Sequence, residues 1–168
     1  MQHDILRNTL KAALLGGVIA GTLDITDAFV LWHFRDVAPD RVLRGIAAGV
    51  LGREARTGGA WVPALGAFLH YFIACTAAGF YYRASAVLPV LRERPVVSGI
   101  AYGGAFYLLM TFVIVPLSAA LGKETLTWNG LFAHTILFGL PIALVTRYVS
   151  RSARSVLYTN GVAKPHDA

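Results

Sequence analysis

The sequence contains few charged residues and a single cysteine. Asp, Glu, Lys and Arg make up only 14% of its 168 residues, whereas ordinary soluble domains contain roughly 25% charged residues. Hydrophobic residues account for 56% of the chain, so the composition indicates an integral membrane protein. The lone cysteine, Cys75, excludes an intramolecular disulfide and a cysteine-based zinc site.

The basic residues do not form one tract. The formal net charge is +6, but Arg and Lys are scattered at the ends of the apolar stretches, as in membrane proteins whose basic residues reach toward the bilayer surface. No basic patch interleaved with aromatic residues is present, which excludes nucleic acid as a partner. The expected partner is the lipid bilayer. A homo-oligomer or a larger membrane complex is also predicted, because four short helices enclose little room for a substrate pathway.

Four apolar stretches are long enough to cross a hydrocarbon core, which needs about 20 residues. They cover about 12–34, 60–83, 95–119 and 127–150. Helix is the only suitable conformation, because an isolated strand at membrane depth would leave its backbone polar groups unpaired. We therefore predict an all-α fold, a four-helix membrane bundle that forms a single domain over residues 1–168.

The connection between the first two spans has a pattern of its own. Apolar residues recur there with helical period, and charged residues lie elsewhere on the helical wheel. Pro39 suits the first turn of such a helix. We predict an amphipathic helix over about 39–55 that lies at the membrane interface. The alternative is a re-entrant element packed against the bundle.

Small residues recur within two of the spans at a spacing typical of close helix packing. Gly17 and Gly21 stand one turn apart in the first span, and Gly99 and Gly103 do so in the third. Glycines at this spacing allow the backbones of two membrane helices to approach closely. We therefore expect these glycines to lie at contacts between spans.

Prolines interrupt the third and fourth spans. Pro116 lies near the end of the third span, and Pro141 lies within the fourth. A proline inside a helix lacks the backbone N–H for one hydrogen bond, and its ring crowds the carbonyl one turn earlier. Both spans are therefore expected to kink.

The distribution of Arg and Lys also predicts the orientation of the chain. When the N-terminus is taken as cytoplasmic, more of these residues lie on the cytoplasmic side than on the opposite side. This is the bias that the positive-inside rule describes. We predict a multi-pass protein with both termini in the cytoplasm.

Two carboxylates lie inside the first apolar stretch. A charged side chain near the centre of a bilayer costs roughly 2.5 to 3.5 kcal/mol, so Asp24 and Asp27 require compensation. Because they stand three residues apart on one helix face, polar side chains of the other spans should face them. The polar candidates on the other spans are His70, His134, Tyr107 and Thr111.

Depth along the spans places these candidates at similar levels. Counted from the predicted span ends at 1.5 Å per residue, Asp24 and His70 both lie about 15 Å below one surface. On the same count, Asp27 and His134 both lie about 10 Å below it. The two candidates in the third span fall near the same levels. The sequence therefore predicts one buried polar layer across the four helices.

Three interpretations of this polar layer remain open. The carboxylates and imidazoles could exchange protons or hold a cation during its passage, which is the leading interpretation. Asp24, Asp27, His70 and His134 also suit zinc or iron by ligand type and number, and would then form the centre of a metal-dependent membrane enzyme. In an accessory or scaffold subunit the layer would only hold the helices in register, although such interhelical hydrogen bonds contribute only about 0.6 kcal/mol each.

No catalytic residues can be assigned from sequence motifs. The chain has no G-x-S-x-G elbow and no Walker loop, and no H-E-x-x-H motif supports the metal interpretation. A haem held between His70 and His134 is disfavoured by the adjacent carboxylates and by the unequal depths of the two imidazoles. Whether the chain is an enzyme therefore stays open.

Several stretches of the chain resemble a known group of proteins. They are GTLD at 21–24, IAAGVLG at 46–52, LGAFLHYF at 65–72 and VPLS at 115–118. Together they are similar to small, four-span bacterial membrane proteins that are broadly YagU-like. The resemblance covers most of residues 12–150 and implies location in the bacterial inner membrane. It implies no catalytic residues.

Overall fold

The structure is a computed structural model and describes residues 2–120 and 125–159. Within these ranges every regular element is a helix, and no strand is present. The elements are α1 (Gln2–His33), α2 (Pro39–Leu51), η1 (Gly52–Arg56), α3 (Trp61–Val87), α4 (Val90–Glu93), α5 (Pro95–Leu109), η2 (Met110–Ile114), α6 (Val115–Leu117), α7 (Trp128–Phe132), η3 (Ala133–Gly139) and α8 (Leu140–Thr159).

Four continuous helical stretches are long and apolar enough to cross a bilayer. They cover His3–His33, Trp61–Val87, Pro95–Leu117 and Trp128–Ala153. In the apolar windows of these stretches, only 17% to 33% of the residues are buried. Most of the span surface therefore faces outward, as a lipid-facing surface does. The predicted all-α four-helix bundle is confirmed, and the chain is a multi-pass membrane protein.

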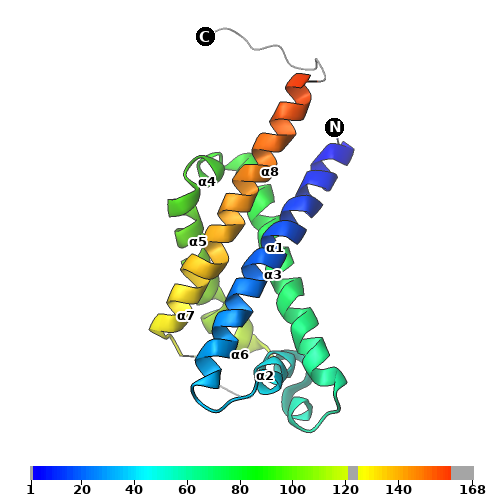
Figure 1. Ribbon diagram of the computed structural model, residues 1–168, viewed down its shortest axis with the longest axis vertical. Coiled ribbons are helices and arrows are strands. Elements are labelled where there is room, and N and C mark those ends of the chain that lie inside the picture. Colours follow the sequence, from blue (N-terminus) through cyan, green and yellow to red (C-terminus); the bar gives the residue numbers. More distant parts are fainter. Residues whose placement is uncertain (1, 121–124, 160–168) are drawn as a thin grey trace.

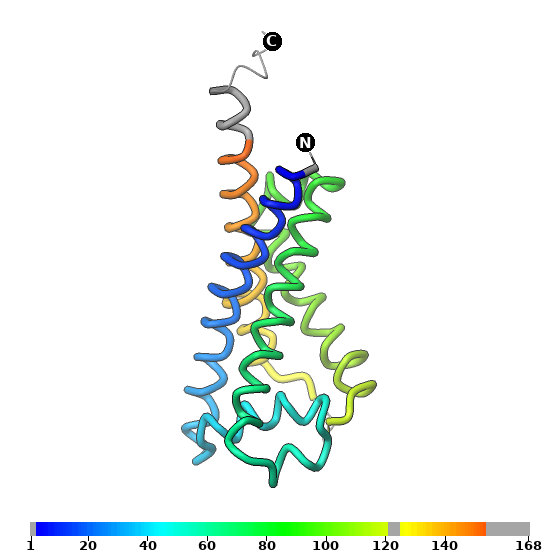
Figure 2. The backbone as a smooth tube through the Cα atoms, turned by 90° about the vertical axis from the view of Figure 1, so that its right-hand side faces the viewer, coloured from blue at the N-terminus to red at the C-terminus, as the bar shows by residue number. Residues whose placement is uncertain are grey.

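The four spans run antiparallel and give the bundle two distinct ends (Figure 1). The beginning of α1, the short helix α4 and the later turns of α8 lie at one end, which we name the terminal end. The helices α2 and α6 lie at the other, which we name the α2 end. Figure 2 shows α2 and η1 curling across this end between α1 and the segment around α6.

The helix predicted between the first two spans is present as α2, and η1 follows it directly. Pro39 occupies its first turn, and Gly52 ends it with a φ of 57°. The backbone of Leu43 lies so close to Gly66 of α3 that a Cβ atom at Gly66 would collide with the Leu43 carbonyl. A backbone hydrogen bond of 2.9 Å from Ala119 N to Gly49 O attaches α2 to the chain after α6. The location of this helix at the membrane interface stays a prediction.

The glycines with one-turn spacing lie at contacts between spans, as predicted. A Cβ atom at Gly17 of α1 would collide with the backbone of Cys75 in α3. A Cβ atom at Gly103 of α5 would collide with the backbone of His134 in η3. Because the backbones touch at these points, the two helix pairs depend on the absence of a side chain.

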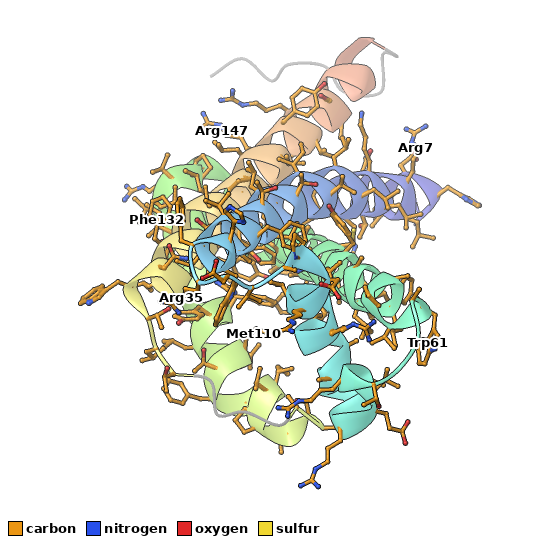
Figure 3. All side chains as sticks on the ribbon, turned by 60° about the horizontal axis from the view of Figure 1, so that its bottom comes forward. Arg7, Arg35, Trp61, Met110, Phe132 and Arg147 are labelled. Carbon is orange, nitrogen blue, oxygen red and sulfur yellow. The ribbon has the colours of Figure 1, made fainter. Side chains whose placement is uncertain are left out.

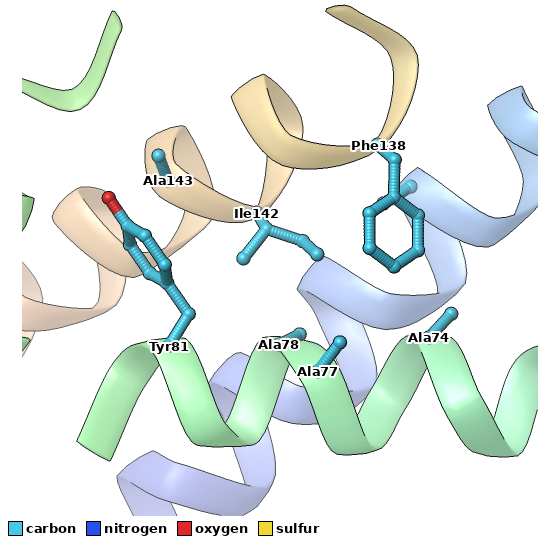
Figure 4. Packing of buried hydrophobic residues seen from close by; sticks show 8 residues of the cluster. Ala74, Ala77, Ala78, Tyr81, Phe138, Ile142 and Ala143 are labelled. Carbon is cyan, nitrogen blue, oxygen red and sulfur yellow. The ribbon is translucent and has the colours of Figure 1, made fainter. Parts of the chain in front are cut away.

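The main apolar core lies between the middle of the bundle and the terminal end. Alanines of α3 form one wall, and Phe138 and Ile142 of the fourth span pack against them (Figure 4). Small side chains on α3 let α1 and the fourth span approach closely. The buried members of this core are Ala20, Ala74, Ala77, Ala78, Tyr81, Phe138, Ile142 and Ala143.

Two spans contain a π-helical segment, η2 in the third and η3 in the fourth. Each segment ends two residues before a proline predicted to kink its span, Pro116 and Pro141 respectively. The carbonyls one turn before these prolines belong to residues inside η2 and η3, and the prolines cannot donate an N–H to them. The wider π pattern accommodates these unmatched carbonyls and is the local form of the predicted distortion.

Candidate functional site

Two of the predicted polar residues, Asp24 of α1 and His134 of η3, approach each other from different spans. His134 Nδ1 lies 3.8 Å from Asp24 Oδ1. The same Nδ1 lies 2.9 Å from the backbone oxygen of Gly130, one turn earlier. Because a carbonyl oxygen only accepts, Nδ1 must carry the hydrogen of this bond. In the neutral ring the hydrogen is therefore on Nδ1, and Nε2 carries none.

Asp27 has a different partner, on the helix that precedes η3. Its Oδ2 accepts a 2.8 Å hydrogen bond from Asn129 Nδ2 in α7. Asn129 was not among the predicted residues, because an amide near the end of a span is unremarkable in a sequence. The only signal for it was its position on the same predicted span, five residues before His134. The two aspartates thus connect α1 to two successive turns of the fourth span.

His70 of α3 bonds to the backbone of α1 through the carbonyl that precedes the aspartates. Its Nε2 donates to the Gly21 oxygen at 2.8 Å, so in the neutral ring the hydrogen is on Nε2. The imidazole lies within electrostatic range of Asp24. On the same two helices, the Thr22 and Tyr71 hydroxyls lie 3.0 Å apart. The polar contact between α1 and α3 therefore runs alongside the carboxylates.

Tyr107 and Thr111 lie on the third span, and both are buried. The Tyr107 hydroxyl accepts a 2.9 Å hydrogen bond from the Thr127 backbone N–H, directly before α7. Its ring centroid lies 4.8 Å from that of His134. Tyr107 thus positions the beginning of the fourth span and packs beside the imidazole. Thr111 lies within η2.

The prediction that the two aspartates and two histidines are buried is wrong. All four side chains are only half-buried, and 16% of the Asp24 side chain is exposed. At this level Gly21 and Ile25, which are both buried, mark the inward face of α1. Asp24 stands three residues after Gly21, which is less than a full turn of helix, so its side chain points to the flank of α1 and not along the inward face. Asp27, three residues further, is turned away from that face in the same direction. The bundle therefore covers most of the Asp24 and His134 side chains without burying them completely.

The predicted metal-ligand set is not brought together. Within residues 2–120 and 125–159, no group of three or more His, Cys, Asp and Glu side chains is arranged to hold a metal ion. His70 and Asp27 hydrogen-bond to other groups, as described above, which leaves Asp24 and His134 as a pair. A zinc or iron site stays a prediction without a convergent set of ligands.

A cavity of about 520 Å³ lies at the α2 end, between α2, α3 and the third span. Its walls are mainly apolar, and none of the six residues predicted for the polar layer lines it. The cavity is therefore separate from the Asp24–His134 pair and provides no polar pathway to it. Residues on its walls include Trp32, Ile46, Val50, Leu69, Met110 and Ile114.

Comparison with known proteins does not add to this description. No protein-family model matches the chain, and no match was found among curated proteins or among solved structures.

Proposed function

We propose that this membrane protein handles protons at the Asp24–His134 pair. The observation that carries the proposal is the 3.8 Å approach of an imidazole and a carboxylate from two different spans. Ionisable side chains inside membrane helices are rare and commonly belong to proton or ion pathways. Histidine changes its charge near physiological pH, so the pair combines two groups suited to proton exchange.

The geometry assigns a separate task to each atom of the pair. Nδ1 of His134 keeps its hydrogen on the Gly130 carbonyl, while Nε2 takes up and releases the proton. Uptake gives an imidazolium, which the Asp24 carboxylate stabilises at close range. Release from Nε2 returns a neutral imidazole. Because Asp24 Oδ1 lies on the Nδ1 side of the ring, the role of Asp24 is to stabilise the imidazolium, and the proton leaves from Nε2 to the surroundings. The partial exposure of both side chains supports proton exchange with the surroundings.

The π-helical backbone around His134, which accompanies Pro141, is a further feature that fits the proposal. His134 lies in η3, a π-helical segment, and π-helical turns occur frequently at functional sites. The wider turn changes the direction in which the following side chains project. His70 provides a second titratable imidazole within electrostatic range of Asp24, so protons have a further acceptor on α3.

A proton-flux assay tests the proposal directly. The full chain is reconstituted into liposomes that contain a pH-sensitive dye, and a potassium gradient with valinomycin drives proton entry. We expect protein-dependent flux that falls at least about tenfold in Asp24→Asn, because the neutral amide carries no charge to stabilise the imidazolium. His134→Gln should lose flux to a similar degree, because its amide does not titrate.

Asp36→Asn is the matched control. It makes the same chemical change in the exposed connection after α1, where the φ of residue 36 is 55°, a conformation that asparagine tolerates. It should keep wild-type flux. Wild-type flux no greater than that of empty liposomes, or full flux in a correctly folded Asp24→Asn variant, would contradict the proposal.

A structural role is the second candidate, and the Asp27–Asn129 hydrogen bond favours it. In that case the polar residues only hold α1 against the fourth span, and the chain acts as an accessory or scaffold subunit. The aspartate variants would then lower thermal stability without any change in flux. Measurement of unfolding and flux on the same preparations separates the two functions.

The location of the protein belongs to the same proposal. An even number of spans supports placing both chain ends on one side, and the Arg and Lys count supports the cytoplasm as that side. The resemblance to YagU-like proteins supports the bacterial inner membrane. A homo-oligomer would cover the exposed flank of α1 that carries Asp24, and crosslinking in native membranes tests for it.

A further inference from the structure

The terminal end of the bundle contains a second cavity, of about 620 Å³. It lies between α1, α3, α4 and α8, far along the spans from the Asp24–His134 pair. Four cationic side chains line it, and Asp4 is the one carboxylate among the lining residues that the structure describes. The four cations are Arg7, Lys11, Arg83 and Arg92. The lining therefore favours an anion.

Arg92 supplies the more specific observation. Its Nε is inaccessible to solvent and has no hydrogen-bond partner among the described residues. A buried charged donor without an acceptor is costly, and such groups in native proteins call for an explanation. Arg92 lines the cavity with its other atoms, because the Nε itself is not accessible. A ligand there would therefore meet the rest of the Arg92 side chain.

The fold holds Arg92 in place through both of its neighbouring helices. The Tyr81 hydroxyl of α3 donates to the Leu91 carbonyl at 2.8 Å, directly before Arg92. The Ser98 hydroxyl of α5 donates to the Val90 carbonyl at 3.2 Å. Tyr81 is 1% exposed, so this attachment is rigidly packed. These two bonds fix the backbone of α4 directly before Arg92.

The other cations differ in how far they are already engaged. Arg7 lies 3.3 Å from the Asp4 carboxylate on the same turn of α1 and projects from the beginning of that helix (Figure 3). Lys11 Nζ lies 6.0 Å from the centre of the Tyr148 ring. Arg83 and Arg92 both act electrostatically on Tyr82, whose hydroxyl interacts with Ser150. The hydroxyls of Tyr82 and Ser150 add polar groups to the cationic lining.

We propose that this cavity binds a phosphate group. Guanidinium groups present several N–H donors in a planar arrangement that matches phosphate oxygens. The cavity lies at the ends of the spans, where phospholipid headgroups meet a membrane protein, and basic pockets between membrane helices bind anionic headgroups. The phosphate is therefore carried by an anionic phospholipid or by a soluble phosphate compound. The site is independent of the Asp24–His134 pair and of the function proposed for it.

A binding experiment with defined probes tests the proposal. The detergent-solubilised full chain is titrated with dioctanoyl phosphatidylglycerol, dioctanoyl phosphatidylcholine and inorganic phosphate. Binding is measured by native mass spectrometry and by the shift in thermal unfolding. We expect Arg92→Gln to weaken the binding of the anionic probe about tenfold, the loss of one strong charge-assisted hydrogen bond.

Arg94→Gln is the matched control. Arg94 is exposed two residues further along the chain and does not line the cavity, so its replacement should leave binding within about twofold of wild type. Arg83→Gln gives a second test from α3 in case Arg92→Gln does not fold. It should also weaken binding of the anionic probe.

The probes separate the two sources of the phosphate. Tighter binding of phosphatidylglycerol than of inorganic phosphate, lost in Arg92→Gln, assigns a lipid headgroup. Arg92-dependent binding of inorganic phosphate with an equal affinity assigns a soluble phosphate compound. Binding that is equal in wild type, Arg92→Gln and Arg83→Gln would overturn the proposal, and so would the absence of binding by every probe.

Discussion

The two halves of the bundle are built in different ways. Toward the terminal end, regular α-helices pack through alanines around Tyr81 and Ile142. Toward the α2 end, two spans change to π-helix and polar side chains connect the helices. Apolar packing is not directional, so small apolar side chains can pack between regular α-helices. Hydrogen-bonding side chains must meet at defined distances and angles. In this protein they lie in and beside the π-helical segments.

The same contrast separates the two candidate sites. The Asp24–His134 pair lies beside the irregular helices and is half-buried. The basic cavity lies beside the regular core, where Tyr81 and Ser98 fix α4. A site for proton exchange benefits from groups that can change their contacts. A site for a phosphate group benefits from donors that are already in place.

Gly103→Ala is expected to cause the largest loss of stability, and it acts in the irregular half of the bundle. Gly103 lies where α5 meets η3, and a Cβ atom there would collide with the His134 backbone. Overpacking of this kind costs about 1–3 kcal/mol, so thermal unfolding in detergent should occur at a lower temperature. The added methyl group would also displace η3, which carries His134, so proton flux should fall as well.

The neighbouring glycine is the control for this variant. At Gly104 a Cβ atom would lie 3.6 Å from Thr135 Cγ2, an ordinary van der Waals distance. Gly104→Ala should therefore leave both stability and flux near wild type. Equal stability of the two variants would show that η3 is not packed rigidly against α5.

A smaller loss is expected in the regular half from Tyr81→Phe. The variant removes the hydroxyl that donates to the Leu91 carbonyl and leaves a buried acceptor unsatisfied, at about 1 kcal/mol. Thermal unfolding measures this loss. Tyr148→Phe, at a residue that is 60% exposed, should cause no comparable change. If both variants behave alike, the hydroxyl does not fix α4.

The smallest effect is expected for the hydrogen bond between Asp27 and Asn129, in the polar half of the bundle. A double-mutant cycle with Asp27→Ala and Asn129→Ala isolates their 2.8 Å hydrogen bond. Interhelical hydrogen bonds in membranes contribute about 0.6 kcal/mol on average, because the separated helices also find polar partners. A coupling energy of several kcal/mol would instead identify this bond as the main attachment of α1 to the fourth span.

The sequence was sufficient for the span architecture and for part of the polar contacts. Length and hydropathy predicted four helices, and the glycine spacing correctly identified contacts such as Gly17 with α3. Depth counting placed Asp24 level with His70 and Asp27 level with His134, whereas the structure pairs Asp24 with His134 and Asp27 with Asn129. Depth carries no information about which side of a helix faces which neighbour.

The amino-acid sequence by itself determined the membrane class, the number of spans and the positions of the prolines that distort two of them. These follow from local hydropathy and backbone chemistry, which need no knowledge of neighbours. Only the tertiary structure decided that the carboxylates are half-buried and that Asn129 pairs with Asp27. It alone assembled the basic cavity from four helices. Helix rotation and π-helical turns set these contacts, and both depend on how the spans pack against one another.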